Sequence, residues 1–193
     1  MAWLVAGLGN PGDRYAATRH NLGRMVADAL ISEAGARRKK VRFLPAEIAE
    51  IDVGEHRVVV VTSTMFMNES GPSYAGVARK RGIEPANVIA VHDEIEIAPG
   101  GFRIKLGGGS AGHNGLRSLT NALGTPDYLR VRVGVGRPPG RQDPADFVLA
   151  AIAPRHRDDV AGWIDRGAEA VRSLIVDGLS VTQDRFNRNA PGD

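Results

Sequence analysis

Apolar segments with strand-like composition alternate along this chain with segments that have helical spacing, and this alternation restricts the fold more than any other feature. The runs Ala2–Ala6 and Val58–Val61 are apolar throughout, which is typical of strands buried on both faces. Segment 18–34 repeats apolar residues every three to four positions, and Gly35 follows as a helix stop. Strands that alternate with helices predict an α/β fold: a twisted, mixed, largely parallel sheet with helices on both faces.

The remaining segments fit the same scheme. Further strands are expected at 87–92, 102–106 and 128–135, and further helices at about 70–81, 113–123 and 154–177. A chain of 193 residues with 42% hydrophobic composition suits one domain. We place this single domain at residues 1–185 and expect a polar C-terminal tail at 186–193.

Composition excludes several classes of protein. The chain has no cysteine, so disulfides, thiolate zinc sites and cysteine nucleophiles are excluded. No run approaches the ~18 apolar residues of a membrane span, and the N-terminus lacks the basic region of a signal peptide, so we expect a cytoplasmic protein. The net charge is +3, with basic clusters at 37–42 and 79–81. Such clusters attract phosphate backbones, but each is equally typical of a solvated face.

Polar residues follow three of the predicted strands. Asn10 comes after the first strand, Asn68 after the valine-rich strand, and His92-Asp93 ends the strand at 87–92. In open α/β sheets, ligands bind outside the carboxyl ends of the strands. We therefore expect a functional site at this edge of the sheet.

His20 stands at a predicted helix start, where a histidine is more often a cap or a surface residue than a catalyst. Asp93 makes it a candidate, because a carboxylate can hold one imidazole nitrogen and leave the other to take a proton from water. The spacing does not show that the two residues meet. A metal site built from His20, His92, Asp93 and His113 is not expected, because these residues lack a recognised ligand spacing.

Two glycine-rich segments have competing interpretations. Residues 7–12 match the dinucleotide fingerprint G-x-G-x-x-G, but Pro11-Gly12 makes a turn and helical spacing begins only near Thr18, which argues against a bound nucleotide cofactor. Residues 107–115 lack the lysine-serine ending of a phosphate-binding P-loop. They predict either a mobile hairpin or a loop that approaches a ligand, with Lys105 as a point charge for a phosphate.

Phe66 and Met67 also allow two interpretations. They are either core residues or an apolar wall that stacks a nucleobase. The rival to an enzyme is a non-catalytic RNA-binding module, which would use the same basic clusters. Such a module has no need of His20 and Asp93 together, so their joint presence favours the enzyme.

In combination, these residues resemble the bacterial-type peptidyl-tRNA hydrolases, in the family's order and over nearly the whole chain. The matching segments are 7–12, Tyr15, 18–23, 67–71, 92–94, 107–115, 132–138 and 146–149. The resemblance implies an enzyme that hydrolyses the ester between the peptide and the 3′ ribose of tRNA, and so recycles tRNA from prematurely released peptidyl-tRNA. It also implies that the enzyme needs no metal or cofactor, binds the acceptor end and 5′ phosphate of peptidyl-tRNA, and is a monomer without an obligate protein partner.

The resemblance also implies residue roles. His20 would be the general base that activates water, Asp93 would keep it basic, and Asn10 would favour substrates with a blocked amino end. The implied substrate and tRNA contacts are Tyr15, Phe66, Met67, Asn68, His113, Asn114, Lys105 and Arg132.

Lys105 would clamp the 5′ phosphate with one arginine of the group Arg130, Arg132 and Arg137. We assign Arg132, although the sequence does not choose among the three. In one departure from the family, Ala111 replaces a common second consecutive glycine, which predicts a stiffer or narrower loop.

Overall fold

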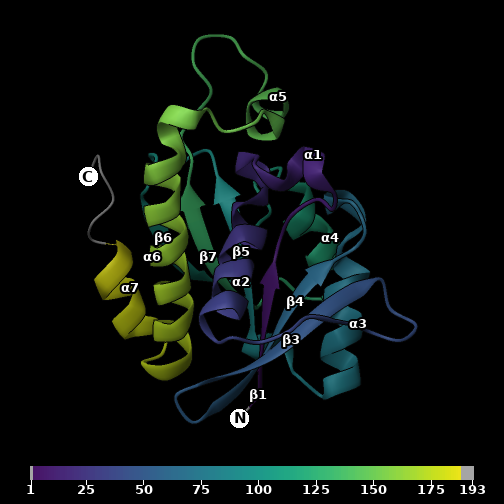
Figure 1. Cartoon of the computed structure of the whole chain (residues 1–193). Coiled ribbons are helices and arrows are strands. Elements are labelled where there is room, and N and C mark those ends of the chain that lie inside the picture. The colour runs from purple at the N-terminus through teal and green to yellow at the C-terminus, as the bar shows by residue number, and fades with distance from the viewer. Residues whose placement is uncertain (1, 188–193) are drawn as a thin grey trace.

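A mixed seven-stranded sheet forms the centre of the structure, a computed structural model that describes residues 2–187 (Figure 1). Four mutually parallel strands occupy its middle: β4 (His56–Ser63), β1 (Ala2–Gly7), β5 (Val88–Glu94) and β7 (Leu129–Gly134). Antiparallel strands complete the two edges: β2 (Lys39–Lys40) and β3 (Ala46–Val53) beside β4, and β6 (Phe102–Leu106) beside β7. The order β2-β3-β4-β1-β5-β7-β6 confirms the predicted mixed sheet and adds β2 and β3, which were not predicted.

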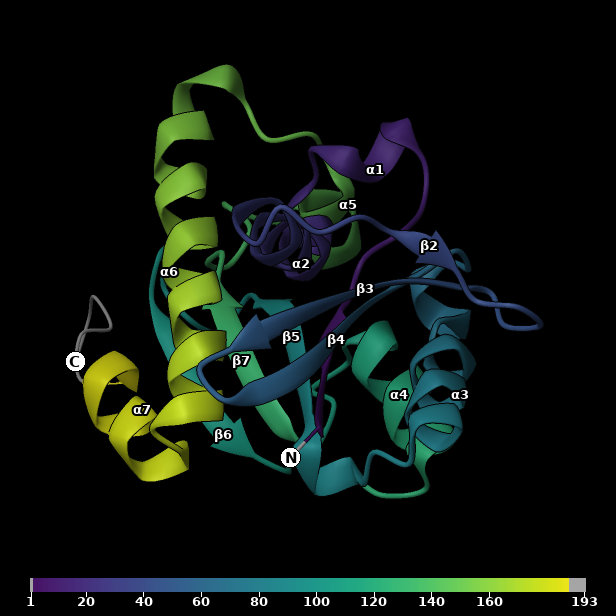
Figure 2. The same cartoon turned by 60° about the horizontal axis from the view of Figure 1, so that its bottom comes forward.

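Helices cover both faces of the sheet, as predicted (Figure 2). One face carries α2 (Leu22–Glu33) and α6 (Arg157–Val176), and the other carries α3 (Gly71–Arg81) and α4 (Asn114–Leu123). Successive strand residues serve different cores: Val58 and Val60 pack with α2 and α6, whereas Val59 and Val61 pack with α3 and α4. Because both faces are buried, the central strands are apolar without alternation.

Close packing of α2 on the sheet fixes where the chain enters this helix. The predicted helix at 18–34 is divided into a 3₁₀ turn, Arg19–Asn21, and α2. A Cβ atom at Gly23 would lie 1.9 Å from the Val91 carbonyl oxygen, and one at Gly7 would lie 2.5 Å from the Ala27 Cβ. The helix therefore lies directly on the backbones of β1 and β5, and this contact brings His20 to the carboxyl end of β5.

The C-terminal region extends past the predicted domain boundary at 185. Helix α7 runs from Leu179 to Asn187, and Phe186 is buried against the ring of Phe102, with ring centroids 6.1 Å apart. The Asn187 side chain accepts a hydrogen bond from the Ile104 N–H. Two residues of the predicted tail thus belong to the folded domain, and residues 188–193 lie outside the described residues.

Short elements complete the carboxyl edge of the sheet. They are α1 (Asp13–Ala16), α5 (Pro144–Leu149) and the 3₁₀ turns Met67–Glu69 and Pro154–His156. A further 3₁₀ turn, Pro85–Asn87, leads into β5 at the opposite, amino edge. No helix within residues 2–187 has both the length and the apolar character that a membrane span requires.

Candidate active site

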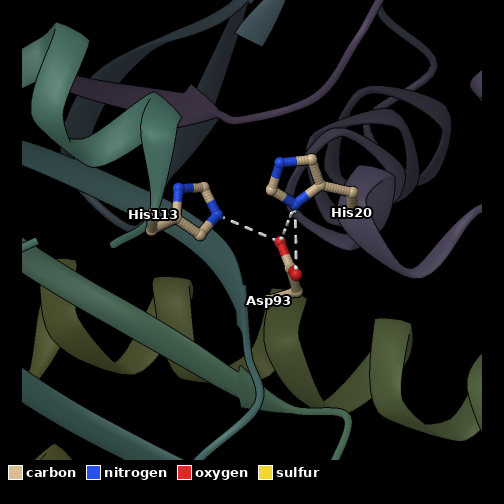
Figure 3. Close-up of side chains that lie close together, drawn as sticks. All are labelled: His20, Asp93 and His113. Atoms are coloured by element: carbon tan, nitrogen blue, oxygen red, sulfur yellow. Dashed lines mark hydrogen bonds and ion pairs between the residues drawn. The ribbon is translucent and has the colours of Figure 1, made fainter. Parts of the chain in front are cut away.

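Asp93, at the end of β5, accepts hydrogen bonds from two histidine rings, both of which point toward its carboxylate (Figure 3). His20 Nδ1 lies 2.9 Å from Asp93 Oδ1 and 3.2 Å from Oδ2. His113 Nε2 lies 3.0 Å from the same Oδ1. The contact between His20 and Asp93, which spacing alone left open, is therefore confirmed.

The surroundings of His113 define which of its nitrogens carries the proton. His113 caps α4, and its Nδ1 accepts the N–H groups of Gly115 (3.1 Å) and Leu116 (3.3 Å). A ring nitrogen that accepts a hydrogen bond carries no proton, so the proton is on Nε2 and is donated to Asp93. His113 is held as a neutral donor by the backbone of its own helix.

The same hydrogen bonds oppose metal binding. The possible ligand atoms of His20, Asp93 and His113 lie within 4.8 Å of one another, so distance alone permits a metal ion. Binding would require the lone pair of His113 Nε2 and would move the proton to Nδ1, against two backbone N–H groups. This donor set does not suit a metal, in agreement with the absence of a metal-ligand spacing in the sequence.

Asp93 is an ionised, buried carboxylate. Burial raises its pKa, but attraction to the protonated form of His20 and the hydrogen bonds from His113 and His20 outweigh burial and hold the pKa well below its usual range. His20 therefore donates its Nδ1–H to Asp93. Its Nε2 makes no hydrogen bond within the described residues and can accept a proton from water.

His20 and Asp93 both line a cavity of about 450 Å³. Its walls come from the start of α4, where His113 and Asn114 lie, and from residues 143–148 around α5. The α5 wall was missed in the sequence. Its signal was present, because Asp143 caps the helix by accepting two N–H groups and Pro144 occupies the first helical position.

His92 lies behind this centre and is fully buried. Its Nδ1–H donates to the Asp93 carbonyl at 2.7 Å, and its Nε2 has no partner in the described residues. Burial lowers the pKa of His92 well below its ordinary value, so the ring stays neutral. It packs edge-to-face on His113, with ring centroids 4.9 Å apart.

Asn10 is fixed by three hydrogen bonds beside this centre. Its Oδ1 accepts the Met67 N–H at 2.8 Å, and its backbone N–H and C=O form a reciprocal pair with the Asn21 amide at 2.8 and 2.9 Å. Asn10 lines a separate cavity of about 150 Å³ next to α1, not the His20 cavity. Asn21 was not singled out from the sequence. Its position directly after His20 was the available signal.

The structure separates the two apolar residues of the 66–67 pair. Phe66 is 51% exposed and meets the edge of the Tyr15 ring at a centroid distance of 6.2 Å, whereas Met67 is 3% exposed and belongs to the core. Asn68 lines a neighbouring groove of about 620 Å³ together with Arg117. Arg117 also donates to Asn114 Oδ1, so the groove reaches the start of α4.

A cavity of about 330 Å³ is lined by Lys105, Arg130 and Arg132. Arg130 is buried and donates to the carbonyls of Gly108 (2.5 Å) and Gly109 (2.6 Å), so it holds the glycine-rich loop. Arg137 does not line the cavity and is paired with the exposed Glu96. Of the three arginines that the sequence left open, Arg130 and Arg132 share a cavity with Lys105, and Arg130 is the one bound to the glycine-rich loop.

The basic clusters at 37–42 and 79–81 lie next to each other. The Lys80 ammonium donates to the Arg42 carbonyl, and both Lys39 and Arg81 contact Glu50. None of these residues lines the cavities described above. The clusters are exposed surface, in keeping with the solvated-face interpretation.

Comparisons with known proteins agree with one another. The family model described as peptidyl-tRNA hydrolase matches residues 4–192. The chain is 50% identical to a peptidyl-tRNA hydrolase of Frankia alni, over 96% of this chain and 93% of the relative, and 51% identical to one of Mycobacteroides abscessus, over 96% and 95%. The crystal structure of peptidyl-tRNA hydrolase from Acinetobacter baumannii matches with a TM-score of 0.90 at 30% identity, over 98% of this chain and 96% of that one.

Proposed function

This chain belongs to the peptidyl-tRNA hydrolase family, and from that membership we propose that His20 is the general base of its reaction. The protein is an enzyme that hydrolyses peptidyl-tRNA. One observation carries the proposal: His20 Nδ1 is held 2.9 Å from the ionised Asp93, while its Nε2 has no hydrogen-bond partner among residues 2–187.

The reaction follows from this arrangement. His20 Nε2 takes a proton from a water molecule, and the resulting hydroxide attacks the carbonyl that joins the peptide to the 3′ ribose. Asp93 stabilises the imidazolium that forms, and His20 returns the proton to the departing ribose oxygen. The products are a tRNA with a free ribose hydroxyl and a peptide carboxylic acid, which ionises to the carboxylate by releasing its proton to solvent. General base catalysis of this kind contributes about 10²- to 10⁴-fold to a rate.

Asparagine side chains supply the polar contacts in this proposal. Asn114 lines the His20 cavity and would orient the peptide or stabilise the developing oxyanion, to which one good donor contributes about 3 kcal/mol. Asn10 Oδ1 is committed to the Met67 N–H, so its Nδ2 is the group left to bind a blocked amino end. Tyr15, Phe66 and Asn68 would contact the tRNA end or the peptide, and Phe66 is the more exposed of the two aromatic rings.

Lys105 and Arg132 would bind the 5′ phosphate of the tRNA. Both line the same cavity, which adjoins the His20 cavity through the shared residues Glu94 and Ala111. Phosphate binding by a lysine and an arginine combines a point charge with a planar donor. Met67 and His113 would act indirectly, the first by holding Asn10 and the second by holding Asp93.

In the cell, the enzyme would recycle tRNA from prematurely released peptidyl-tRNA as a cytoplasmic monomer, without metal, cofactor or obligate protein partner. All the proposed catalytic side chains come from one chain. Light scattering at assay concentrations tests the monomer, and a dimer that alone is active would refute it.

The deciding experiment is hydrolysis of an N-blocked aminoacyl-tRNA by the wild type and by His20→Ala, with and without a chelator. We expect the substitution to lower turnover by about 10²-fold or more while tRNA affinity is retained, and the chelator to have no effect. His156→Ala is the matched control, because the His156 side chain is 42% exposed and its ring meets Asp159 at 3.8 Å and Arg155 at 3.1 Å, away from the cavities described above. Near-normal turnover by His20→Ala would refute the assignment.

A further inference from the structure

Glu94 is a buried carboxylate in the cavity proposed above for the 5′ phosphate, where its charge would oppose the ligand. It is 7% exposed and lines both the His20 cavity and the cavity that contains Lys105 and Arg132. A carboxylate in this position weakens the attraction of the pocket for phosphate. Its presence therefore needs a compensating role.

The contacts of Glu94 indicate what that role is. Arg132 donates to Glu94 Oε2 through both Nε (3.2 Å) and Nη2 (2.9 Å), so one edge of the guanidinium is fixed. The other carboxylate oxygen, Oε1, accepts the Glu96 N–H at 3.2 Å, which in turn fixes Glu94. Arg132 Nη1 makes no hydrogen bond within the described residues, and the side chain of Arg132 remains 25% exposed.

The neighbouring cations cannot replace Arg132. Arg130 lines the same cavity, but its guanidinium is bound to the carbonyls of Gly108 and Gly109. Lys105 is exposed, and an ammonium group gives no directional pair of donors. Selectivity for a phosphate at one defined place therefore depends on the orientation of Arg132.

We propose that Glu94 is a positioning residue for recognition of the 5′ phosphate: it fixes Arg132 before the tRNA binds and leaves Nη1 as the donor for the phosphate. The proposal rests on the assignment of Lys105 and Arg132 to that phosphate. An arginine that is ordered in advance loses less rotamer freedom on binding, which offsets the repulsion from the carboxylate.

The test compares two substrates that differ only at the 5′ end. An N-blocked aminoacyl-tRNA is prepared with its 5′ phosphate or with a 5′ hydroxyl, and the ratio of the two kcat/KM values is measured. We expect the wild type to prefer the phosphate, Arg132→Ala to lose that preference, and Glu94→Gln to lower the ratio by about fivefold or more. Adding Glu94→Gln to Arg132→Ala should change nothing further, because the two residues act as one unit.

A second variant separates orientation from charge. Glu94→Asp keeps the charge but shortens the side chain, so it should lower the ratio as Glu94→Gln does. If Glu94 acts only through its charge, Glu94→Gln raises the ratio and Glu94→Asp leaves it unchanged, which overturns the proposal. Glu96→Gln is the matched control, because Glu96 is exposed and its carboxylate pairs with Arg137 outside the cavity.

The remaining outcomes are also decisive. If Glu94 has only a structural role, its variants lower both kcat/KM values equally and leave the ratio unchanged, which overturns the inference. In that case the phosphate assignment still stands, provided that Arg132→Ala loses the preference for the 5′ phosphate. If Arg132→Ala retains the wild-type preference, the phosphate assignment itself fails and the inference fails with it.

Discussion

Two adjacent carboxylates at the end of β5 are both buried and both hydrogen-bonded, but they have different partners. Asp93 accepts from two imidazoles, of which His113 is held neutral by the backbone N–H groups of α4. Glu94 accepts from the guanidinium of Arg132, which is always charged. Asp93 can therefore stabilise the positive charge that forms when His20 takes up a proton, whereas the charge of Glu94 is already neutralised by Arg132.

This difference assigns the two carboxylates to different parts of the function. A carboxylate next to a titratable imidazole stabilises positive charge as it develops during the reaction. A carboxylate next to a permanent cation fixes geometry and changes little during the reaction. Substitutions at Asp93 should consequently change kcat, and substitutions in the Glu94–Arg132 cavity should change KM.

Asp93→Asn should give the largest effect. The amide keeps the size of the side chain but removes the charge, and its NH₂ group can favour the wrong tautomer of His20. We expect kcat to fall by about 10²- to 10⁴-fold with KM nearly unchanged, as measured by single-turnover hydrolysis. A rise in KM with kcat unchanged would contradict the distinction between the two carboxylates.

Lys105→Ala should give a smaller effect of the other kind. Loss of one phosphate contact should raise KM by about tenfold at low salt and reduce the dependence of log KM on log salt concentration by about one. Titration of KM against salt measures both. Arg137→Ala is the matched control, because it removes a cation that lies outside the cavity. An unchanged salt dependence in Lys105→Ala would remove Lys105 from the phosphate contact.

Acid should destabilise the fold through His92, with the smallest effect of the three. Because burial lowers the pKa of His92 in the folded state, the unfolded chain binds more protons below the ordinary histidine pKa, and stability falls as pH falls. We expect Tm to drop by about 5 °C between about pH 7 and pH 5, and His92→Gln to flatten this dependence. A wild-type Tm that is constant over this range would mean that His92 is protonated in the folded protein.

The central strands and the main helices were predictable because burial on two faces, or on one helical stripe, leaves a direct pattern in the sequence. Strand β3 was not. Its isoleucines, Ile48 and Ile51, are three residues apart, as in a helix, and its alanines and glutamates favour helices. Antiparallel pairing with β4 determines its conformation, and this pairing is a tertiary interaction that local sequence does not record.

Site residues were predictable as candidates, but their contacts were not. His20 and Asp93 are 73 positions apart, and they meet because Gly23 lets α2 lie against Val91. Phe66 and Met67 are adjacent apolar residues with no difference in pattern, yet one is exposed and the other is buried. Family resemblance implied the roles of these residues. Only the packing shows which of their side-chain atoms have no hydrogen-bond partner among the described residues.

The backbone conformation of Ala111 lowers the population of the glycine-rich loop conformation in this structure. Ala111 has φ +46°, a left-handed conformation that costs an L-residue roughly 1–2 kcal/mol and costs glycine almost nothing. Relative to a chain with glycine there, this conformation is about tenfold less populated among the alternatives of the free loop. Position 111 thus sets how often the free loop has this conformation, and amide hydrogen exchange of the loop in Ala111→Gly would measure the difference.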